Sequence, residues 1–582
     1  MATAAASSVQ AEALAVLKTV FGYPAFRGQQ ADVVAHVASG NNALVLMPTG
    51  GGKSLCYQVP ALVRSGVTVV ISPLIALMQD QVAALLRKGV RAALLNSTLD
   101  RDETARVENE VRRGEIKLLY LSPERLMTDR CQRLLEASPL ALFAIDEAHC
   151  ISEWGHDFRP EYLQLSVLHE RFPHVPRIAL TATADLQTRA EIAERLGLTD
   201  ARVFLSSFDR PNITYGIVDK HRTHRQLLAF IQARYLGAAG VVYCSSRARV
   251  ERTAAFLDAS GIPALPYHAG LSPREREENQ AWFIEQPGVV MVATIAFGMG
   301  IDKPNVRFVA HVDVPKSVES YYQETGRAGR DGLPSEVWMA YREADATALY
   351  DRIRRADVSE RRRRAQIAKL DAMLALCETA ECRRVRLLAY FGEVSEPCGQ
   401  CDTCARPPLS FDGNHAVSRV LMQVYRTGQR HNASQVAEAL GGRAEKWKAT
   451  IRQCVALGIL AVDHEGDGAL SRTPVSAAVL RGEQRVVLRR WRPTARPKAR
   501  KRRARMRGDP MLARAALARL VAWRTEEAAR RGVPVHVVLH DAALIEIAQR
   551  QPQTRWGLRW IPGVGSRRVE LYGAALIRLV RK

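Results

Sequence analysis

The sequence contains no long hydrophobic run. Hydrophobic residues make up 47% of its 582 residues, yet no span of about 18 or more consecutive apolar residues is present that could cross a bilayer. The first residues, MATAAASSVQAEAL, lack the basic flank and apolar core that are typical of a secretory signal. We therefore expect neither a membrane protein nor a secreted one, but a cytosolic protein.

Acidic residues are too few to balance the basic ones. The chain carries 60 Asp and Glu against 83 Lys and Arg, which gives a formal net charge of +23 at pH 7. Such an excess favours association with a polyanion, and nucleic acid is the first candidate. Solvated surface charge in a generally arginine-rich protein is the alternative.

The chain is too long for a single hydrophobic core, and its length predicts about three to five domains. In residues 42–205, the short apolar runs ALVLM, VTVVIS, IKLLYLS, LALFAID and RIALTAT alternate with longer amphipathic stretches. The pattern starts again with AGVVYCSS, PGVVMVAT and RFVAHVD and continues to about residue 345. Apolar strands that alternate with helices predict parallel sheets covered on both faces, so we expect two α/β domains in tandem.

The rest of the chain is organised differently. A basic helical region containing RIRRADVSERRRRAQIAKL leads into a cluster of cysteines, a compact α/β segment and the stretch WRPTARPKARKRRARMRGDP. Proline and like charge prevent that stretch from forming a core, so it predicts a linker before the last, amphipathic helices. The predicted domain boundaries are 1–205, 206–345, 346–407, 408–490, 491–510 and 511–582.

A glycine-rich turn follows the first apolar run. The residues MPTGGGKS lie between the predicted strand ALVLM and the predicted helix LCYQVPALV, so bare amides and the positive end of a helix converge on one loop. Lys53 would reach the β- and γ-phosphate oxygens of a nucleoside triphosphate, and the Ser54 hydroxyl would bind Mg²⁺. The strict pattern has a glycine where Met47 stands, and a structural turn without a ligand is the alternative. The remaining loop positions are Thr49, Gly50, Gly51 and Gly52.

Two carboxylates end a second apolar strand, LFAIDEAHC. Asp146 would hold Mg²⁺ through water, and Glu147 would polarise the attacking water as general base. Such a pair is often only the start of a helix. Here it follows a strand of the same predicted sheet as the phosphate loop, at the edge where open α/β folds bind ligands. The two motifs together predict hydrolysis of a nucleoside triphosphate.

Seven of the ten cysteines fall into two groups. Some are scattered among apolar residues, as buried reduced thiols are: Cys56, Cys131, Cys150 and Cys244. Three crowd into CGQCDTC, namely Cys398, Cys401 and Cys404, and in a cytosolic chain this clustering favours a metal over disulfides. A closed tetrahedral Cys₄ site would hold a structural zinc ion rather than a catalytic one. The fourth ligand would be Cys377 or Cys382.

A series of motifs occurs in a characteristic order: FGYPAFRGQQ, MPTGGGKS, SPLIALMQDQ, YLSPERL, DEAHCISEWGHDFRPEY, LTATA, VVYCSSR, VATIAFGMGIDKPNVRFV and QETGRAGRDG. In order and spacing they resemble those of superfamily 2 helicases of the RecQ family, and the resemblance spans nearly the whole chain. The aromatic-rich loop after DEAH is the most specific element. The implied fold class is α/β, with two tandem RecA-like parallel-sheet domains, a zinc-binding helical module, a winged helix and a small all-α HRDC-like bundle.

The resemblance implies an ATP-dependent DNA helicase that translocates 3′ to 5′ and opens forked or recombination-intermediate duplexes in DNA repair, recombination, replication and the SOS response. The implied cofactors are Mg²⁺ with ATP and one structural Zn²⁺. DNA tails, forks and junctions are the implied partners, with single-stranded-DNA-binding protein and topoisomerase, at the bacterial nucleoid. The alternatives are a DNA-stimulated translocase with weak unwinding, an RNA-directed helicase, and a nucleic-acid-binding scaffold with an inactive motor.

The resemblance also assigns residues to the nucleotide. Gln30 would bond the adenine edge while Tyr23 and Arg27 pack against the base; core packing is the alternative for Tyr23, because FRGQQ replaces the usual FRPGQ here. In QETGRAGRDG, Arg327 and Arg330 would act as arginine fingers, and Gln323 would reach the same phosphate region; ordinary solvated arginines are the alternative. Since the fingers and the phosphate loop come from different domains, hydrolysis would open and close the cleft between them.

Coupling to DNA is implied by the loop CISEWGHDFRP. Trp154 and Phe158 would stack on unpaired bases, Arg159 would bind phosphate or base, and His156 would relay loop movement to the ATP site. An aromatic cluster in a packed loop is the alternative. The family likeness also implies that Thr181 and Thr183 of LTATA link the phosphate site to the domain interface.

The C-terminal regions carry weaker signals. The family context of ECRR favours Cys382, placed on a helix, as the fourth zinc ligand. Residues KWKATIRQCVALGILAV and PVSAAVLRGE resemble a winged helix, in which DHEGDG predicts a hairpin whose His464 would separate strands, or else an ordinary surface turn. In the HRDC-like tail, IPGVGSRR predicts either a backbone phosphate contact or a tight interhelical turn. The basic linker would add salt-sensitive affinity for DNA.

Overall fold

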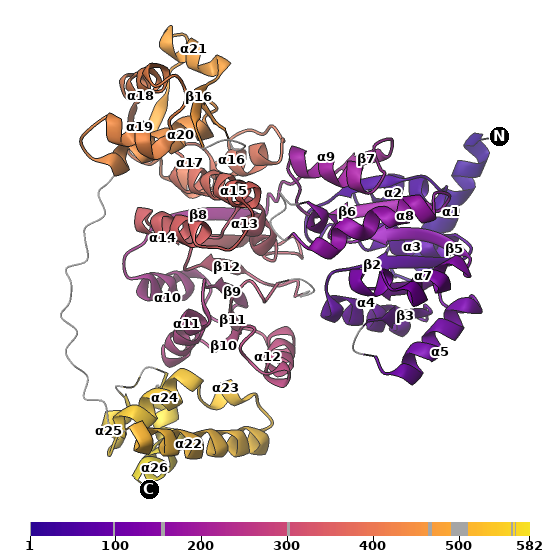
Figure 1. Ribbon diagram of the computed structural model, residues 1–582. Helices are drawn as coiled ribbons and strands as arrows, with labels where there is room; N and C mark the ends of the chain where they lie inside the picture. Colours follow the sequence, from indigo (N-terminus) through magenta and orange to yellow (C-terminus); the bar gives the residue numbers. More distant parts are fainter. Residues whose placement is uncertain are drawn as a thin grey trace.

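The computed structural model describes residues 2–96, 99–152, 158–298, 303–463, 468–490, 510–559, 561, 563–564 and 566–581. Figure 1 shows two α/β bodies side by side, a winged-helix region at one end of the second body and a C-terminal helical body at its other end. No helix among the described residues is both long enough and apolar enough to cross a membrane.

The first α/β body is built on a seven-stranded parallel sheet of order β3-β4-β2-β5-β6-β1-β7. Its strands are β1 (Ala43–Leu46), β2 (Val67–Ile71), β3 (Ala92–Leu95), β4 (Leu118–Leu121), β5 (Leu140–Ile145), β6 (Arg177–Thr181) and β7 (Arg202–Leu205). Its helices are α1 (Ala2–Thr19), α2 (Gln30–Ala38), α3 (Leu55–Val63), α4 (Ile75–Arg87), α5 (Arg101–Arg112), α6 (Pro123–Leu126), α7 (Asp129–Glu136), α8 (Val167–Arg171) and α9 (Leu186–Arg195), with 3₁₀ turns η1 (Ala148–Ile151) and η2 (Pro160–Ser166).

Both faces of this sheet are covered, as the apolar runs predict. Along β1, Leu44 and Leu46 pack into one hydrophobic cluster and Ala43 and Val45 into another. Side chains alternate between the two faces of a strand, so a strand that is apolar throughout needs helices on both sides. The prediction of a doubly covered parallel sheet is confirmed.

The second α/β body has a six-stranded parallel sheet of order β10-β11-β9-β12-β13-β8. Its strands are β8 (Ile213–Asp219), β9 (Gly240–Tyr243), β10 (Ala264–Tyr267), β11 (Val290–Ala293), β12 (Phe308–His311) and β13 (Ser335–Tyr341). Its helices are α10 (Thr223–Arg234), α11 (Arg247–Ala259), α12 (Pro273–Glu285) and α13 (Val318–Thr325). A capping box formed by Ser272 and Glu275 starts α12.

A cysteine-rich helical module follows, with α14 (Glu343–Arg354), α15 (Glu360–Glu378), α16 (Arg383–Tyr390) and α17 (Asp402–Ala405). It touches both α/β bodies. Lys369 of α15 pairs with Asp185 of the first body, Nζ to Oδ2 at 3.3 Å, and with Glu319 of the second body. Glu319 also accepts a hydrogen bond from the Tyr390 hydroxyl at 2.9 Å. A buried cluster of charges therefore joins three parts of the fold.

The same module holds the segment that connects the two sheets. Glu393 accepts hydrogen bonds from the Ser207 hydroxyl at 2.6 Å and from the Phe208 amide at 2.8 Å. The Phe208 ring stacks on Phe391 with centroids 4.6 Å apart. Arg384 donates to the carbonyl of Ile213 at 2.8 Å. The connecting segment is thus held by the module along its length.

The winged-helix region contains α18 (Asn414–Arg426), α19 (Ala433–Ala439), α20 (Ala444–Ala456) and α21 (Pro474–Leu480), with strands β14 (Ser410–Asp412), β15 (Leu460–Val462), β16 (Leu470–Arg472) and β17 (Val487–Arg489). Strands β15 and β16 pair in antiparallel fashion, which confirms the predicted hairpin. His464, the residue predicted to separate strands, lies outside the described residues. Arg452 of α20 bonds Glu378 of α15 at 2.7 Å, which ties this region to the cysteine-rich module.

The C-terminal body is entirely helical over its described residues, as predicted. It comprises α22 (Pro510–Arg531), α23 (Val535–Val538), α24 (Asp541–Arg550), α25 (Arg555–Arg559) and α26 (Ser566–Arg581) around its own apolar core. It packs against α11 and β10 of the second α/β body (Figure 1). Gly563 sits in this contact, where an added Cβ would come within 3.2 Å of Ala255, and Arg568 pairs with Asp258. Gly563 and Arg568 of the IPGVGSRR segment therefore face protein in this arrangement.

Candidate nucleotide, metal and DNA sites

The glycine-rich loop has the backbone of a phosphate cradle. Gly50 (φ +83°) and Gly52 (φ +77°) are in the left-handed region, which side chains rarely adopt. At Gly51 an added Cβ would lie 2.9 Å from the Pro48 carbonyl oxygen. Lys53 donates to the Met47 carbonyl at 3.3 Å, while the Met47 side chain is buried in the core. The side chain that departs from the strict pattern at Met47 therefore fills the core beneath the loop, while its carbonyl faces Lys53.

Gln30 connects the preceding segment to this loop. Its Nε2 donates to the Gly51 carbonyl at 3.0 Å, and its Oε1 accepts from the Arg27 amide at 2.9 Å. Tyr23 is 46% exposed, so the alternative that it is a core residue is wrong. Arg27 is exposed as well. Apart from the motif itself, nothing in the sequence predicted that Gln30 contacts the phosphate loop.

The acidic pair follows β5, at the same sheet edge as the loop after β1. Burial raises the pKa of Asp146 to about 7, repulsion by Glu147 adds to the shift, and Lys53 opposes it. Glu147 has φ +47°, an uncommon conformation for a residue with a side chain. Its amide donates to Asp146 Oδ1 at 2.9 Å, and the Tyr162 hydroxyl donates to the Asp146 carbonyl at 3.0 Å. The strained turn fixes the two carboxylates relative to each other.

His149 links the acidic pair to the next strand, a role that the sequence analysis missed although the residue stands in the DEAH string. Its Nδ1 lies 3.3 Å from Glu147 Oε2 and 3.0 Å from the Thr181 hydroxyl. Thr181 in turn donates to the Thr183 carbonyl at 3.1 Å. A continuous polar path therefore runs from Glu147 to the end of β6.

The QETGRAGRDG motif of the second body lies against the phosphate loop of the first. An added Cβ on Gly326 would be 3.3 Å from Thr49, and one on Gly50 would be 3.5 Å from Arg330. Arg210 bridges the bodies by donating to the carbonyls of Thr49 and Gly326, both at 3.3 Å. Arg210 was not predicted, because nothing in its local sequence marks a residue that crosses between domains.

The arginines of this motif lie in the loop that follows α13. Arg327 is 5% exposed, so the alternative of a solvated arginine is wrong for it, and its Nε and Nη1 have no hydrogen-bond partner. Gln323 is half-buried on α13. Buried guanidinium nitrogens without partners indicate an anion site at this position.

Part of the aromatic-rich loop can be described. Phe158 lies beneath the guanidinium of Arg362 on α15, with 5.1 Å from the charge to the ring centroid. Arg159 donates to the Pro73 carbonyl at 2.8 Å. Trp154 and His156 lie outside the described residues. The loop end is therefore in contact with the basic helix α15, which the sequence analysis did not assign to this site.

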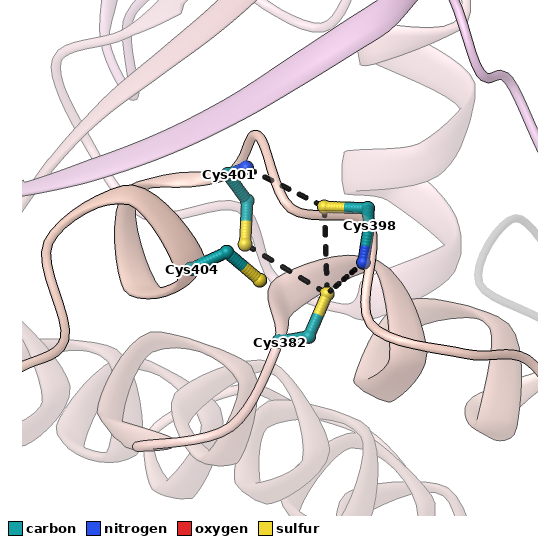
Figure 2. A group of neighbouring side chains, drawn as sticks. All are labelled: Cys382, Cys398, Cys401 and Cys404. Carbon is teal, nitrogen blue, oxygen red and sulfur yellow. Dashed lines mark hydrogen bonds between the residues drawn. The ribbon is translucent and has the colours of Figure 1, made fainter.

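The four cysteines Cys382, Cys398, Cys401 and Cys404 come together, with their sulfur atoms within 4.8 Å of one another (Figure 2). The sulfur of Cys382 is 3.5 Å from that of Cys398 and 3.8 Å from that of Cys401. Cys382 caps α16 rather than lying inside it, which corrects the predicted placement on a helix. Cys377 is buried in α15 and is not part of this group.

Backbone amides support these sulfurs. The Cys398 amide donates to the Cys382 sulfur at 3.3 Å, and the Cys401 amide donates to the Cys398 sulfur at 3.4 Å. Such bonds stabilise thiolates and orient them as ligands. Four sulfurs in this arrangement fit a closed tetrahedral zinc site. The scattered cysteines Cys56, Cys131, Cys150 and Cys244 are buried and free, as predicted.

Four protein-family models match the chain. They are the DEAD/DEAH box helicase model over residues 27–192, the helicase conserved C-terminal domain over 222–332, the RecQ zinc-binding model over 343–405 and the HRDC domain over 513–580. The matches follow the same order as the two α/β bodies, the cysteine-rich module and the C-terminal helices.

Curated relatives match along nearly the whole chain. "ATP-dependent DNA helicase RecQ" of Pasteurella multocida is 42% identical, with 98% of this chain and 94% of the relative covered. The proteins of the same name from Haemophilus influenzae and Bacillus subtilis are 42% and 37% identical, each over 98% of this chain and over 96% and 98% of their own lengths. With these identities over matched lengths, and with a phosphate loop, an acidic pair and a four-cysteine cluster in place, the chain belongs to the RecQ family of helicases.

Proposed function

We propose that this protein is an ATP-dependent DNA helicase that translocates 3′ to 5′ and opens forked or recombination-intermediate duplexes. The observation that carries the proposal is the contact between the phosphate loop of one α/β body and the arginine-bearing loop of the other. Because the two halves of the site belong to different bodies, binding and hydrolysis of ATP change their relative position. That motion drives the protein along a strand.

The phosphate loop binds the triphosphate in this proposal. Lys53 contacts the β- and γ-phosphate oxygens, and the amides of Gly50, Gly51 and Gly52 face the phosphates, next to Thr49. The carboxamide of Gln30, held by the loop, reads the adenine edge, with the exposed Tyr23 and Arg27 against the base.

Ser54 and Asp146 fit a Mg²⁺ ion. Burial, and then repulsion by Glu147, raises the pKa of Asp146 to about 7. A divalent cation bound at this carboxylate would offset both effects. When bound, Mg²⁺ neutralises charge on the phosphate oxygens.

Glu147 takes a proton from the attacking water at its carboxylate. His149 and Thr181 position it, since both lie on the polar path that ends at Thr183. Arg327 and Arg330 stabilise the charge that develops on the γ-phosphate, and Gln323 reaches the same region. The orphaned guanidinium nitrogens of Arg327 support this role.

DNA binding falls to the aromatic-rich loop and the basic surfaces. Phe158 and Trp154 offer stacking faces, Arg159 offers charge, and His156 transmits loop movement to the ATP site. The net charge of +23 supports a polyanionic partner. His464 of the hairpin is the candidate for strand separation. We place the protein at the nucleoid, with single-stranded-DNA-binding protein and topoisomerase as partners.

Zinc at the four-cysteine cluster has a structural role. A Cys₄ site leaves no open coordination position for a substrate. The ion holds together Cys382 and the CGQCDTC turn, and so supports the module that braces both α/β bodies.

The test is ATP-driven unwinding of one short duplex with either a 3′ or a 5′ single-stranded tail, with Glu147→Gln as the blank. We expect unwinding only with the 3′ tail. Unwinding with the 5′ tail alone would refute the polarity. ATP hydrolysis stimulated by DNA without strand separation would make the protein a translocase, and hydrolysis stimulated by RNA rather than DNA would favour the RNA-directed alternative.

A further inference from the structure

The C-terminal body docks on the second α/β body through buried histidines. His536 of α23 and His540, which precedes α24, are both 0% exposed. Glu251 of α11 meets them across the contact, and one ligand atom of each of these three residues lies within 4.8 Å of the other two. Two imidazoles and a carboxylate from two separate bodies therefore converge on one point.

The polar atoms at this point lack hydrogen-bond partners among the described residues. In that part of the chain no donor or acceptor lies in bonding geometry to either ring nitrogen of His536 or His540, or to Glu251 Oε2. The carboxylates of Glu275 and Asp258 come only within 3.7 Å of His536 Nε2 and 3.8 Å of His540 Nε2, and the Ala264 backbone makes only a weak hydrogen-bond contact with His540. Leaving a buried polar group without a partner is energetically costly. Several such groups in one place indicate a missing ligand.

Glu251 is already oriented toward the histidines. Its Oε1 accepts a hydrogen bond from His268 Nε2 at 2.9 Å, while His268 Nδ1 accepts one from the Gly270 amide at 3.2 Å. Because Nδ1 accepts, His268 presents its Nε2–H to the Glu251 carboxylate. An outer partner of this kind fixes a ligand carboxylate and raises the affinity of a metal site.

The charged groups around the histidines are largely paired with each other. Asp541 pairs with Arg524, and Asp258 pairs with Arg568. Among the described contacts, the Glu251 carboxylate is bonded to His268 and to no lysine or arginine, so it can give its negative charge to a bound ion. Both imidazoles are completely buried, and neutral imidazole is the form of histidine that binds metals.

We propose that Glu251, His536 and His540 bind a divalent transition-metal ion, best matched by Zn²⁺, that fastens the C-terminal body to the second α/β body. Two imidazoles and one carboxylate are a known zinc ligand set, with bonds of about 2.0–2.2 Å, and each ligand atom needs to move by about 1 Å or less to share an ion. Mg²⁺ and Ca²⁺ fit poorly because they prefer oxygen ligands. Water or the Asp258 carboxylate completes the coordination.

This site is separate from the four-cysteine cluster, because it uses different residues in another part of the fold (Figure 1). Its role also differs from that of the cysteine site. With the ion bound, the C-terminal body stays docked on the second α/β body; without the ion, it undocks and is attached only through the preceding linker. Metal availability then controls how far that body can reach for DNA.

The test is the zinc content of the full-length protein after incubation with ZnCl₂ and gel filtration. We expect about two equivalents in the wild type and about one in Glu251→Gln or His540→Gln. The matched control is Glu275→Gln, at the same contact but outside the three-residue site, which keeps both equivalents. Removing the outer partner with His268→Ala should weaken the second site about 10- to 100-fold.

Two further readouts keep the proposal open to refutation if a histidine variant unfolds. Co²⁺ bound at the second site should give visible bands without the sulfur charge-transfer bands of the cysteine site, and Glu251→Gln should remove them. Zn²⁺ should also reduce the radius of gyration of the wild type in solution scattering, but not that of Glu251→Gln. One equivalent of zinc in the wild type, or equal contents in wild type and Glu251→Gln, would overturn the proposal.

Discussion

The ion cluster around Lys369 allows a sharp test of how the parts of this helicase are joined. The Lys369 side chain is 11% exposed, Glu319 is 2% exposed and Asp185 is 24% exposed, so these charges are shielded from water. Burial alone would raise the pKa of Asp185, but Lys369 and the Thr188 amide outweigh it and lower it. Burial likewise opposes the charged form of Lys369, and Glu319 and Asp185 outweigh burial and raise its pKa.

Replacing Lys369 with Met leaves the Glu319 carboxylate buried without its cation. Breaking a buried pair in this way costs about 3–5 kcal/mol, which corresponds to a lowering of about 6–20 °C in the melting of a domain of 150–250 residues. Because the pKa of Asp185 is lowered in the folded state, its carboxylate contributes fully to folding stability above the unfolded pKa, near 3.8. This contribution is lost as the pH falls through the lower, folded-state pKa. At pH 7.5 the full effect should be visible.

The assay is differential scanning calorimetry of the full chain, read at its first transition. Lys369→Met with Glu319→Gln should recover most of the loss, because the amide can still accept the Tyr390 hydrogen bond without a buried charge. Lys18→Met, at an exposed position on α1, is the control and should change little. An unchanged first transition in Lys369→Met, or a double variant no better than the single one, would refute the reasoning.

The remaining predictions concern the nucleotide and zinc sites. Lys53→Ala should abolish ATP hydrolysis while DNA binding, measured by fluorescence anisotropy, stays largely intact; loss of both would contradict the separation of roles. Arg330→Ala should lower kcat about 10³- to 10⁵-fold with ATP binding retained, and a loss below tenfold would remove it as a finger. Cys401→Ser should misfold or destabilise the chain, so a soluble, fully active, zinc-free variant would be contrary evidence. Under the proposal that the ionised Asp146 holds Mg²⁺, and with its pKa raised to about 7, apparent Mg²⁺ affinity in hydrolysis should fall about tenfold per pH unit below 7; a constant affinity from pH 7.5 to 5.5 would argue against this ligand.

The sequence predicted the parts of the site that are built from contiguous residues. The phosphate loop and the acidic pair each depend on one strand and the turn after it, and the CGQCDTC turn depends on local spacing. The alternation of apolar strands and helices likewise predicted both sheets, since each strand is buried on two faces.

Contacts between distant segments could not be predicted in the same way. Arg210 reaches the Thr49 and Gly326 carbonyls only because two separately folded bodies meet there. Arg362 covers Phe158 because α15 lies against the C-terminal end of the aromatic-rich loop. The docking of His536 and His540 depends on the surface of α11, and periodicity within a helix does not specify which other helix it meets.

The hydrogen bonds between the cysteine-rich module and the connecting segment limit how the two α/β bodies can move. Ser207, Phe208 and Ile213 are bonded to Glu393 and Arg384, so the chain between the two sheets does not behave as a slack tether. These hydrogen bonds restrict the relative motion of the two α/β bodies to a few directions, because movement in other directions would break them. The module therefore guides how the two bodies turn against each other, in addition to holding them together.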